Sequence, residues 1–489
     1  MRKIVMLLSA LALSAPVFAQ VQPGVSDSAA PVVLTLDKAL EIALSENVSV
    51  RVADMEIQRS EYAKKGSYAA LLPQVDASAS YMRTIKKQVM YMDGDGFDFG
   101  SMIGESLAAY LFPLYAQHPG LVPPTPSKPE EEETSGSSNE GFSVGRWNTF
   151  SGGVTMGLPL VNAQLWESLR ISSKDVELAV EKARNSRLET VTQVKQAFFS
   201  TLLAKEAFNV YKEVYENALE NFHKTEMRYN VQKASELDYT RAKTTVVSAI
   251  PNVYEAECSV NLALWQLKAV MGVDLDMNID VAGALEDYAQ TMFRDIHEHD
   301  DFTLEGNSSL RQLEIQAEEL ASTIRLQKFA SLPSLSLAFS FTQNAMTNDF
   351  NFSTYQWSPY SYVGLSLNIP IFAGGKRFNA VRQAKVQYSQ LALQKDNAER
   401  QLRIAIRQYL NQMETGMKSY DSAQSALESA HKAYDIATKS YNVGRSTLTD
   451  LNDARLALTQ TQLGVSQTIY NYLVAKSNLE QTLGYDFTE

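Results

Sequence analysis

Few residues of this chain have side chains and a spacing that suit metal binding. Five histidines occur in 489 residues, and only the segment HEHDD (297–301) groups histidine with several carboxylates. Zinc sites built on one helix place two histidines four residues apart, and structural zinc sites usually add cysteine. The segment has neither feature. We therefore interpret it as a solvated linker, and we expect no metal and no cofactor.

Motifs for catalysis are also missing from the sequence. It contains no phosphate-binding glycine loop, no nucleophile elbow and no dinucleotide fingerprint. The one cysteine, Cys258, falls in a predicted helix, and we expect it to be buried rather than reactive. These observations predict that the protein is not an enzyme.

Composition narrows the class of protein further. A net charge of −12 and a pI near 5.1 argue against non-specific nucleic-acid binding. A hydrophobic content of 45% excludes wholesale disorder, and a single cysteine excludes a disulfide framework. Only 23 glycines and 15 prolines interrupt the chain, which indicates long helices.

The first residues have the order of an export signal. Arg2 and Lys3 precede an apolar stretch over 4–15, and Val17-Phe18-Ala19 is a small-residue cleavage site. We interpret residues 1–19 as a signal peptide; the alternative is a buried N-terminal helix. No later stretch offers 18 apolar residues without charge. Any membrane span of the exported protein should therefore consist of strands.

The chain contains two similar halves. RYNVQKASELDYTRA (228–242) resembles SYNVGRSTLTDLNDA (440–454), 212 residues further on, and apolar residues recur every seven positions on both sides of each segment. Such heptads predict antiparallel coiled coils, and at 1.5 Å per residue the longest helices would each run for about 100 Å. We expect a first repeat at 20–272, a linker at 273–306 and a second repeat at 307–489. The predicted helices are 34–72, 163–231, 235–271, 376–443 and 447–484.

Four strands are predicted between these helices. Apolar residues alternate with small or polar residues in four segments, about 74–90, 148–160, 334–344 and 358–371. This alternation is typical of transmembrane strands with one face toward lipid, and a soluble β-sandwich is the alternative. Closed membrane barrels need at least about eight strands, and open edges are not tolerated in lipid. Several copies of the chain should therefore share one barrel.

The first half has a longer connection between its two strands. The segment 91–147 includes the acidic, proline-rich tract PPTPSKPEEEETSGSSNEG (123–141). Low-complexity sequence of this kind does not bury a core, so we expect an exposed loop on the outer face of the barrel. We expect Glu130–Glu133 to form a solvated acidic loop; the alternatives are that they gather divalent cations or repel surface polysaccharide.

Together these motifs resemble the TolC family of outer-membrane efflux channels. LTLDKALEIALSENVSV (34–50) is similar to the N-terminal pattern of the family, and YNVGRSTLTDLNDA (441–454) is similar to its helix-tip motif. The resemblance implies a homotrimer with a shared twelve-strand barrel and a long periplasmic helical tunnel. It also implies an equatorial belt around 273–306, and partners in a periplasmic adaptor protein and an inner-membrane RND or ABC pump.

Individual residues of the tip motif match the family's gate. Asp450 and Asp453 match aspartates that ring the periplasmic entrance, and rings of carboxylates select cations. Tyr441 and Asp238 match residues of the bonds that hold the entrance closed. Arg445 is the candidate basic partner, one residue before the position that the family pattern gives to arginine.

The two tip turns differ at the position that suits a left-handed backbone. Gly444 suits a left-handed turn between two helices. The corresponding first-half position is Gln232, where the family usually has glycine.

Two functions are compatible with this sequence. The first is a passive export duct in the outer membrane, with a gate at its periplasmic end. The second is a structural tether, a coiled coil that spans the periplasm and has no open pore. The duplicated strands and the paired tip motifs favour the duct, and the sequence does not identify its cargo.

Overall fold

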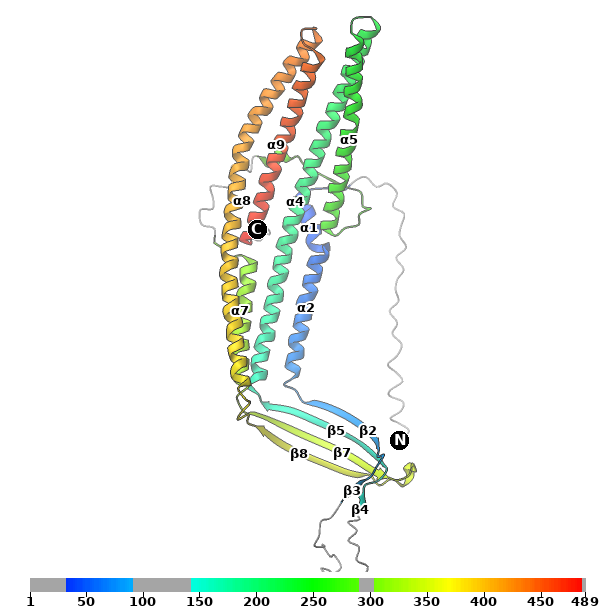
Figure 1. Cartoon of the computed structure of the whole chain (residues 1–489), viewed down its shortest axis with the longest axis vertical. Coiled ribbons are helices and arrows are strands. Elements are labelled where there is room, and N and C mark those ends of the chain that lie inside the picture. The colour runs from blue at the N-terminus through cyan, green and yellow to red at the C-terminus, as the bar shows by residue number, and fades with distance from the viewer. Residues whose placement is uncertain (1–31, 91–141, 290–302, 486–489) are drawn as a thin grey trace, which may run out of the picture. The chain divides into compact units, whose positions relative to one another are not determined.

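The structure, a computed structural model, describes residues 32–90, 142–289 and 303–485 (Figure 1). The chain divides into a helical unit (1–65, 167–327 and 378–489) and a sheet unit (66–166 and 328–377). Each unit contains residues from both halves of the sequence, so the boundaries of the units do not coincide with those of the two sequence repeats. The predicted signal peptide, the loop residues 91–141 and the HEHDD segment lie outside the described residues.

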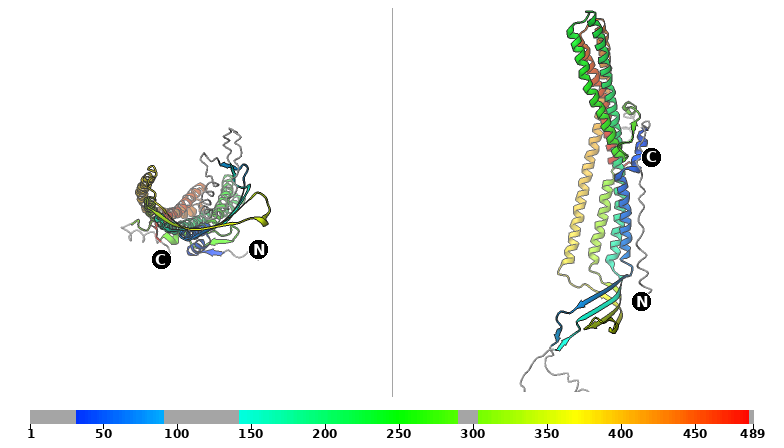
Figure 2. Two further views of the ribbon diagram at one scale, coloured as in Figure 1. Left: turned by 90° about the horizontal axis from the view of Figure 1, so that it is seen from below. Right: turned by 90° about the vertical axis from the view of Figure 1, so that its right-hand side faces the viewer.

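Two long hairpins make up most of the helical unit. They run side by side in Figure 1, and the view from below in Figure 2 also shows them next to each other. The first consists of α4 (Ala163–Asn230) and α5 (Glu236–Met271). The second consists of α8 (Lys376–Asn442) and α9 (Leu448–Leu483). The turns of both hairpins, which we call the first tip (231–235) and the second tip (443–447), lie at the same end of the unit (Figure 1).

Shorter elements pack along the hairpins. They are α1 (Leu36–Glu46), α2 (Val48–Ala69), α6 (Leu285–Ala289) and α7 (Ser308–Phe329), with β1 (Val32–Leu34) paired in parallel to β6 (Ile279–Val281). Ion pairs join α7 to α4 and to α8: Lys174 of α4 contacts Glu318, and Lys395 of α8 contacts Glu314. None of the described helices is both long and apolar enough to cross a membrane.

The main core of the helical unit lies where the hairpins meet these short elements. Phe198 of α4, Met271 of α5 and Tyr472 of α9 are completely buried there. Gly416 of α8 faces Tyr472 so closely that an added methyl group would lie 3.3 Å from the Tyr472 Cβ atom. Large side chains against small ones allow close antiparallel helices, as the heptad pattern predicts.

All four long helices end in the same backbone motif. A residue in the left-handed conformation closes each of them, at Gln232, Gly272, Gly444 and Gly484. After α8, for example, the N–H of Gly444 bonds to the carbonyl of Tyr441 (3.0 Å), and the next N–H bonds to Ser440 (2.9 Å). This Schellman arrangement favours glycine, and Gln232 is the one non-glycine residue with positive φ in the described chain.

The sheet unit is a four-stranded antiparallel sheet in the order β2-β5-β7-β8. The strands are β2 (Gln74–Arg83), β5 (Asn148–Val161), β7 (Ser334–Thr347) and β8 (Ser358–Asn368). The register aligns Val75, Met156, Phe339 and Val363 across all four strands. Neighbouring positions align Asp76, Thr155, Ser340 and Tyr362 instead. Because side chains alternate along a strand, one face of the sheet is apolar and the other is polar.

Two observed strands end earlier than predicted, and β7 runs three residues beyond the predicted 344. The first, expected over 74–90, stops at Arg83, and a separate strand β3 (Gln88–Met90) pairs with β4 (Phe142–Val144) inside the predicted loop. The fully solvated Ile85 and two lysines interrupt the alternation there. The fourth strand ends at Asn368, shortly before Pro370, which has no N–H to donate to a ladder.

The expectation for Cys258 is wrong, because this side chain is exposed. The buried positions of α5 include Ala249, Ala256 and Ala263, which repeat every seven residues. Cys258 is two residues from Ala256, and residues two apart do not share a helix face.

Candidate functional site

Asp450 lies in the first turn of α9 and forms a complete capping box with Thr447. Its Oδ2 accepts hydrogen bonds from the Thr447 N–H (2.9 Å) and the Thr447 hydroxyl (2.7 Å), and its own N–H donates to that hydroxyl (3.2 Å). The bonds from the Thr447 main chain and hydroxyl lower the pKa of the Asp450 carboxyl. Both of these hydrogen bonds use Oδ2, so Oδ1 of this exposed side chain can bind water or a cation.

Asp453 follows Asp450 by nearly one turn and is also exposed. Residues three apart on a helix are surface neighbours, so the second tip presents two carboxylates on one side of α9. A single chain thus supplies both acids of the predicted carboxylate ring, close to the start of a helix.

Asp238 has the same local position in the first hairpin. It lies in the first turn of α5 and accepts a hydrogen bond from the hydroxyl of the capping residue Ser235 (2.7 Å). The Asp238 N–H donates back to that hydroxyl (3.0 Å). Within the described residues, Asp238 makes no bond to Tyr441.

Tyr441 connects the two hairpins near their tips. Its hydroxyl lies 3.2 Å from the hydroxyl of Thr225 on α4. Arg228, in the last turn of α4, places its guanidinium carbon 5.8 Å from the centre of the Tyr441 ring and donates to the Asn442 carbonyl (3.1 Å). The hydroxyl and ring-face contacts of Tyr441 with polar side chains are therefore to α4, while its ring also packs against the apolar cluster of Ala242, Leu448 and Leu451.

Arg445 and Gly444 form the turn of the second tip. Gly444 has φ +75°, as expected for a glycine that closes a helix. Arg445 is exposed, and in the described part of the chain its only recorded bond runs from its main-chain N–H to Ser440. The cation that contacts Tyr441 within the chain is Arg228 instead.

Sequence reasoning missed Thr225 and Arg228. A signal for Arg228 does exist, because a cation in the last turn of a helix is favoured by the helix dipole. Thr225 carries no comparable signal. It is one of several helical threonines that bond to a carbonyl four residues earlier, here Asn221 (2.8 Å).

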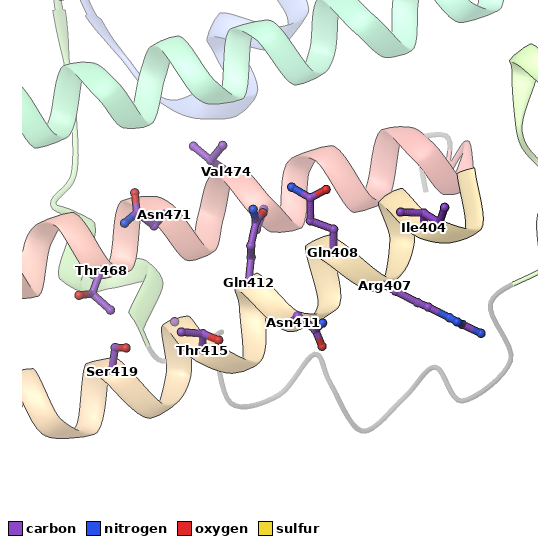
Figure 3. Close-up of a pocket in the computed structure, with 12 residues that line it drawn as sticks. Ile404, Arg407, Gln408, Asn411, Gln412, Thr415, Ser419, Thr468, Asn471 and Val474 are labelled. Atoms are coloured by element: carbon purple, nitrogen blue, oxygen red, sulfur yellow. The ribbon is translucent and has the colours of Figure 1, made fainter. Parts of the chain in front are cut away.

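A groove of about 780 Å³ lies between α8 and α9 (Figure 3). Gln408 and Gln412 extend from α8 toward α9, and Asn471 and Thr468 line the other side (Figure 3). Of the described residues that line it, none carries a carboxylate, thiol or imidazole. The groove therefore offers mainly neutral hydrogen-bonding groups and one cation, Arg407, but no acid–base pair.

No candidate metal centre was found in the described parts of the chain. Residues 32–90, 142–289 and 303–485 contain no group of three or more histidine, cysteine, aspartate or glutamate side chains placed to hold a metal ion. The predicted linker HEHDD is not among these residues.

The helix-tip motif and the four-stranded sheet agree with a comparison to known families. A model for the family described as "Outer membrane efflux protein" matches residues 131–273 and 301–485, which is more than half of the chain. The chain belongs to the outer membrane efflux protein family. This efflux protein is therefore located in the outer membrane, and its family consists of channels and not of enzymes.

Individual relatives of this efflux protein are distant in sequence. Outer membrane protein TolC of Vibrio cholerae is 21% identical, over 68% of this chain and 76% of that protein. Proteases secretion protein PrtF of Dickeya chrysanthemi is 22% identical, over 68% of this chain and 72% of that protein. The crystal structure of the CmeC outer membrane channel of Campylobacter jejuni superposes with a TM-score of 0.66 at 19% identity, covering 93% of this chain and 87% of that one. At this identity the superposition establishes the fold alone.

Proposed function

We propose that this efflux protein is a passive exit duct that conducts substrates from the periplasm and an inner-membrane pump to the exterior. The observation that carries the proposal is the four-stranded sheet, which has one mainly apolar face and one mainly polar face. Such a sheet is suited to contact lipid on one side and a water-filled lumen on the other. A tether would not need this lumen-facing polar surface.

The edges of the sheet support a barrel shared among copies. In the described sheet β2 and β8 are the two edge strands, and all three pairings between them are antiparallel. β8 of one copy can therefore pair with β2 of the next copy in the same antiparallel sense. We infer a homotrimer, in which three copies form a closed twelve-strand barrel without exposed edges.

The repeated helix ends support a duplication. The left-handed closures at 232 and 272 recur at 444 and 484, each 212 residues later. We propose that residues 20–272 and 307–489 are two tandem structural repeats joined by an equatorial segment at 273–306. In the trimer, their hairpins would form a periplasmic tunnel of long antiparallel coiled coils.

The helix tips are the proposed gate. Asp450 and Asp453 would form rings of carboxylates at the entrance of the trimer, and these would favour cations. Tyr441 would hold the hairpins together in the closed state. Asp238 is half-buried and Arg445 is exposed, and the two carry opposite charges; we propose that they pair between neighbouring copies.

The proposed partners are a periplasmic adaptor protein and an inner-membrane RND or ABC pump. Two kinds of relative support this range of partners. One is called a proteases secretion protein and another an outer membrane channel. We propose no nucleic-acid partner and no cofactor.

The test is ion conduction by the purified protein in planar lipid bilayers. We expect cation-selective conductance that multivalent cations block from the periplasmic side. Asp450→Asn with Asp453→Asn should reduce the selectivity and the block. Asp396→Asn with Asp421→Asn removes the same charge from exposed positions of α8 and should change neither. Absence of any conductance would instead support the tether, and an unchanged block would disprove the ring assignment.

A further inference from the structure

Arg455 occupies a position in α9 where neighbouring turns carry buried leucines. Leu451, four residues earlier, is 1% exposed, and Leu458, three residues later, is 8% exposed. Arg455 itself is only 7% exposed. A permanently charged side chain therefore interrupts the apolar seam of this helix.

The contacts of Arg455 join the second hairpin to the first. Its Nη2 donates to the main-chain carbonyl of Glu213 on α4 (3.2 Å). Its guanidinium carbon lies 6.0 Å from the centre of the Tyr434 ring on α8. In the described chain, Arg455 makes no ion pair with a carboxylate. One charged group thus lies between α4, α8 and α9.

The corresponding residue of the first half behaves differently. Lys243 lies 212 residues before Arg455, at the same heptad position of α5, and it is exposed. The burial of Arg455 therefore comes from the contact of α9 with α4, and the heptad position alone does not cause it.

The free-energy cost of burying the Arg455 guanidinium favours separation of α9 from α4. A guanidinium has five N–H donors, and here one main-chain bond and one aromatic ring replace its water. Removing a charge from water costs more than such contacts return unless its hydrogen bonds are well satisfied. Consistently, burial is the largest cause of the lowered pKa of Arg455.

Water has a route to the guanidinium when the contact loosens. A groove of about 330 Å³ lies between α4, α5 and α9, and Arg455 lines it. Its other lining side chains include polar ones from both hairpins: Thr244, Thr245, Ser248, Asn252 and Asn452. Hydroxyl and amide groups along this groove can solvate an arginine as the hairpins part.

We propose that Arg455 is a gate-positioning residue that keeps the contact between α9 and α4 separable, because its charge regains water when the two hairpins move apart. This inference rests on the proposed gating function. A leucine at this position would continue the seam from Leu451 to Leu458, and the closed arrangement would become more stable.

The test compares Arg455→Leu with Arg455→Lys and with the matched control Lys243→Leu. Two readouts are measured on the full-length protein. One is the fraction of time that channels are open in planar bilayers. The other is the distance between spin labels placed at Lys233 and Val443, with Cys258→Ser as background and labelled chains diluted among unlabelled ones.

Arg455→Leu should lower the open fraction by roughly tenfold and reduce the population with separated tips, with no loss of thermal stability. Arg455→Lys should retain most of the wild-type behaviour, and Lys243→Leu should match wild type. If Arg455→Leu does not assemble, Arg455→Met tests the same change with an unbranched side chain.

An open fraction that rises or stays constant in Arg455→Leu would overturn the inference, as would an equal effect of Lys243→Leu. If the wild-type protein conducts no ions but the label distances respond as expected, the channel function fails and the role of Arg455 stands.

Discussion

The hydroxyl of Tyr441 on α8 donates a hydrogen bond to the hydroxyl of Thr225 on α4 across a distance of 3.2 Å. The direction follows from the second bond of Thr225. Its hydroxyl lies 2.8 Å from the carbonyl of Asn221, which can only accept, so the single threonine proton is used there. The pair is partly buried, and it joins two hairpins that are separate in sequence.

Removal of this bond should favour the open gate. Tyr441→Phe deletes the donor and keeps the ring, so the closed arrangement should lose about 1 kcal/mol, or roughly a fivefold shift toward open channels. Thr225→Val deletes the acceptor and should have a similar effect. The open fraction in planar bilayers measures both variants.

Tyr254→Phe is the control for these variants, because Tyr254 is an exposed tyrosine of α5. It should conduct as the wild-type protein does. If Tyr441→Phe has the same open fraction as Tyr254→Phe, Tyr441 does not hold the gate.

Acid should loosen the start of α9 only at low pH. The bonds from Thr447 lower the pKa of Asp450 in the folded protein. The contribution of Asp450 to the stability of the helix start is therefore fully present above its ordinary pKa of 3.8, and it is lost as pH falls through the lower pKa of the folded protein. Hydrogen exchange over 443–455, corrected for the intrinsic rate, should show equal protection at about pH 7 and pH 5 and less at about pH 3. Asp450→Asn should abolish this pH dependence. A loss of protection that begins near neutral pH would assign the effect to another group.

Asn47 and Asn307 should be equivalent anchors for the far ends of the two hairpins. Each donates through Nδ2 to a carbonyl near a helix end, Asn47 to Val270 (2.6 Å) and Asn307 to Thr482 (2.7 Å). Each also accepts a main-chain N–H at the start of the following helix. Because both are buried, Asn→Ala at either position should cost about 2 kcal/mol and lower the thermal unfolding midpoint.

The aspartate variants separate the two roles of these anchors. Asn47→Asp and Asn307→Asp keep the acceptor that caps the helix and lose the donor to the distant carbonyl. We expect a large part of the destabilisation to remain in both. Midpoints close to wild type would show that the capping bond alone matters.

Glycine at the first tip should stabilise the protein. Gln232 adopts φ 60°, where a side chain other than glycine costs about 1–2 kcal/mol, although glycine also makes the unfolded chain more flexible. We therefore expect Gln232→Gly to gain roughly 0.5 kcal/mol, seen as slower hydrogen exchange at the first tip. Gly444→Gln places the same residue at the second tip and should have the opposite effect. An exchange rate that does not change in either variant would mean that the turns bear no strain.

Periodic features were predictable because each depends on neighbours along the chain. Gly416 in the heptad ladder indicated a close helix contact, and the structure places it against Tyr472. Gly444 indicated a left-handed turn, and it has one. The alternation after Pro73 and Pro333 marked strands that the structure pairs into one sheet with β5 and β8.

Side-chain partners across the two hairpins were not predictable in this way. Tyr441 contacts Thr225 and Arg228, more than 200 residues away in sequence, and no local pattern selects these two from the many polar residues of α4. Cys258 was expected to be buried, but the rotation of α5 about its axis places it on the exposed side.

Periodic patterns in consecutive residues were sufficient to predict the two long hairpins and the amphipathic strands. The helix-tip motif was sufficient to predict the family and the acidic second tip. The tertiary structure decided which helix faces contact each other. Arg455 and Lys243 show the difference: both hold one heptad position, yet only Arg455 is buried, because α9 packs against α4 and Lys243 stays in water.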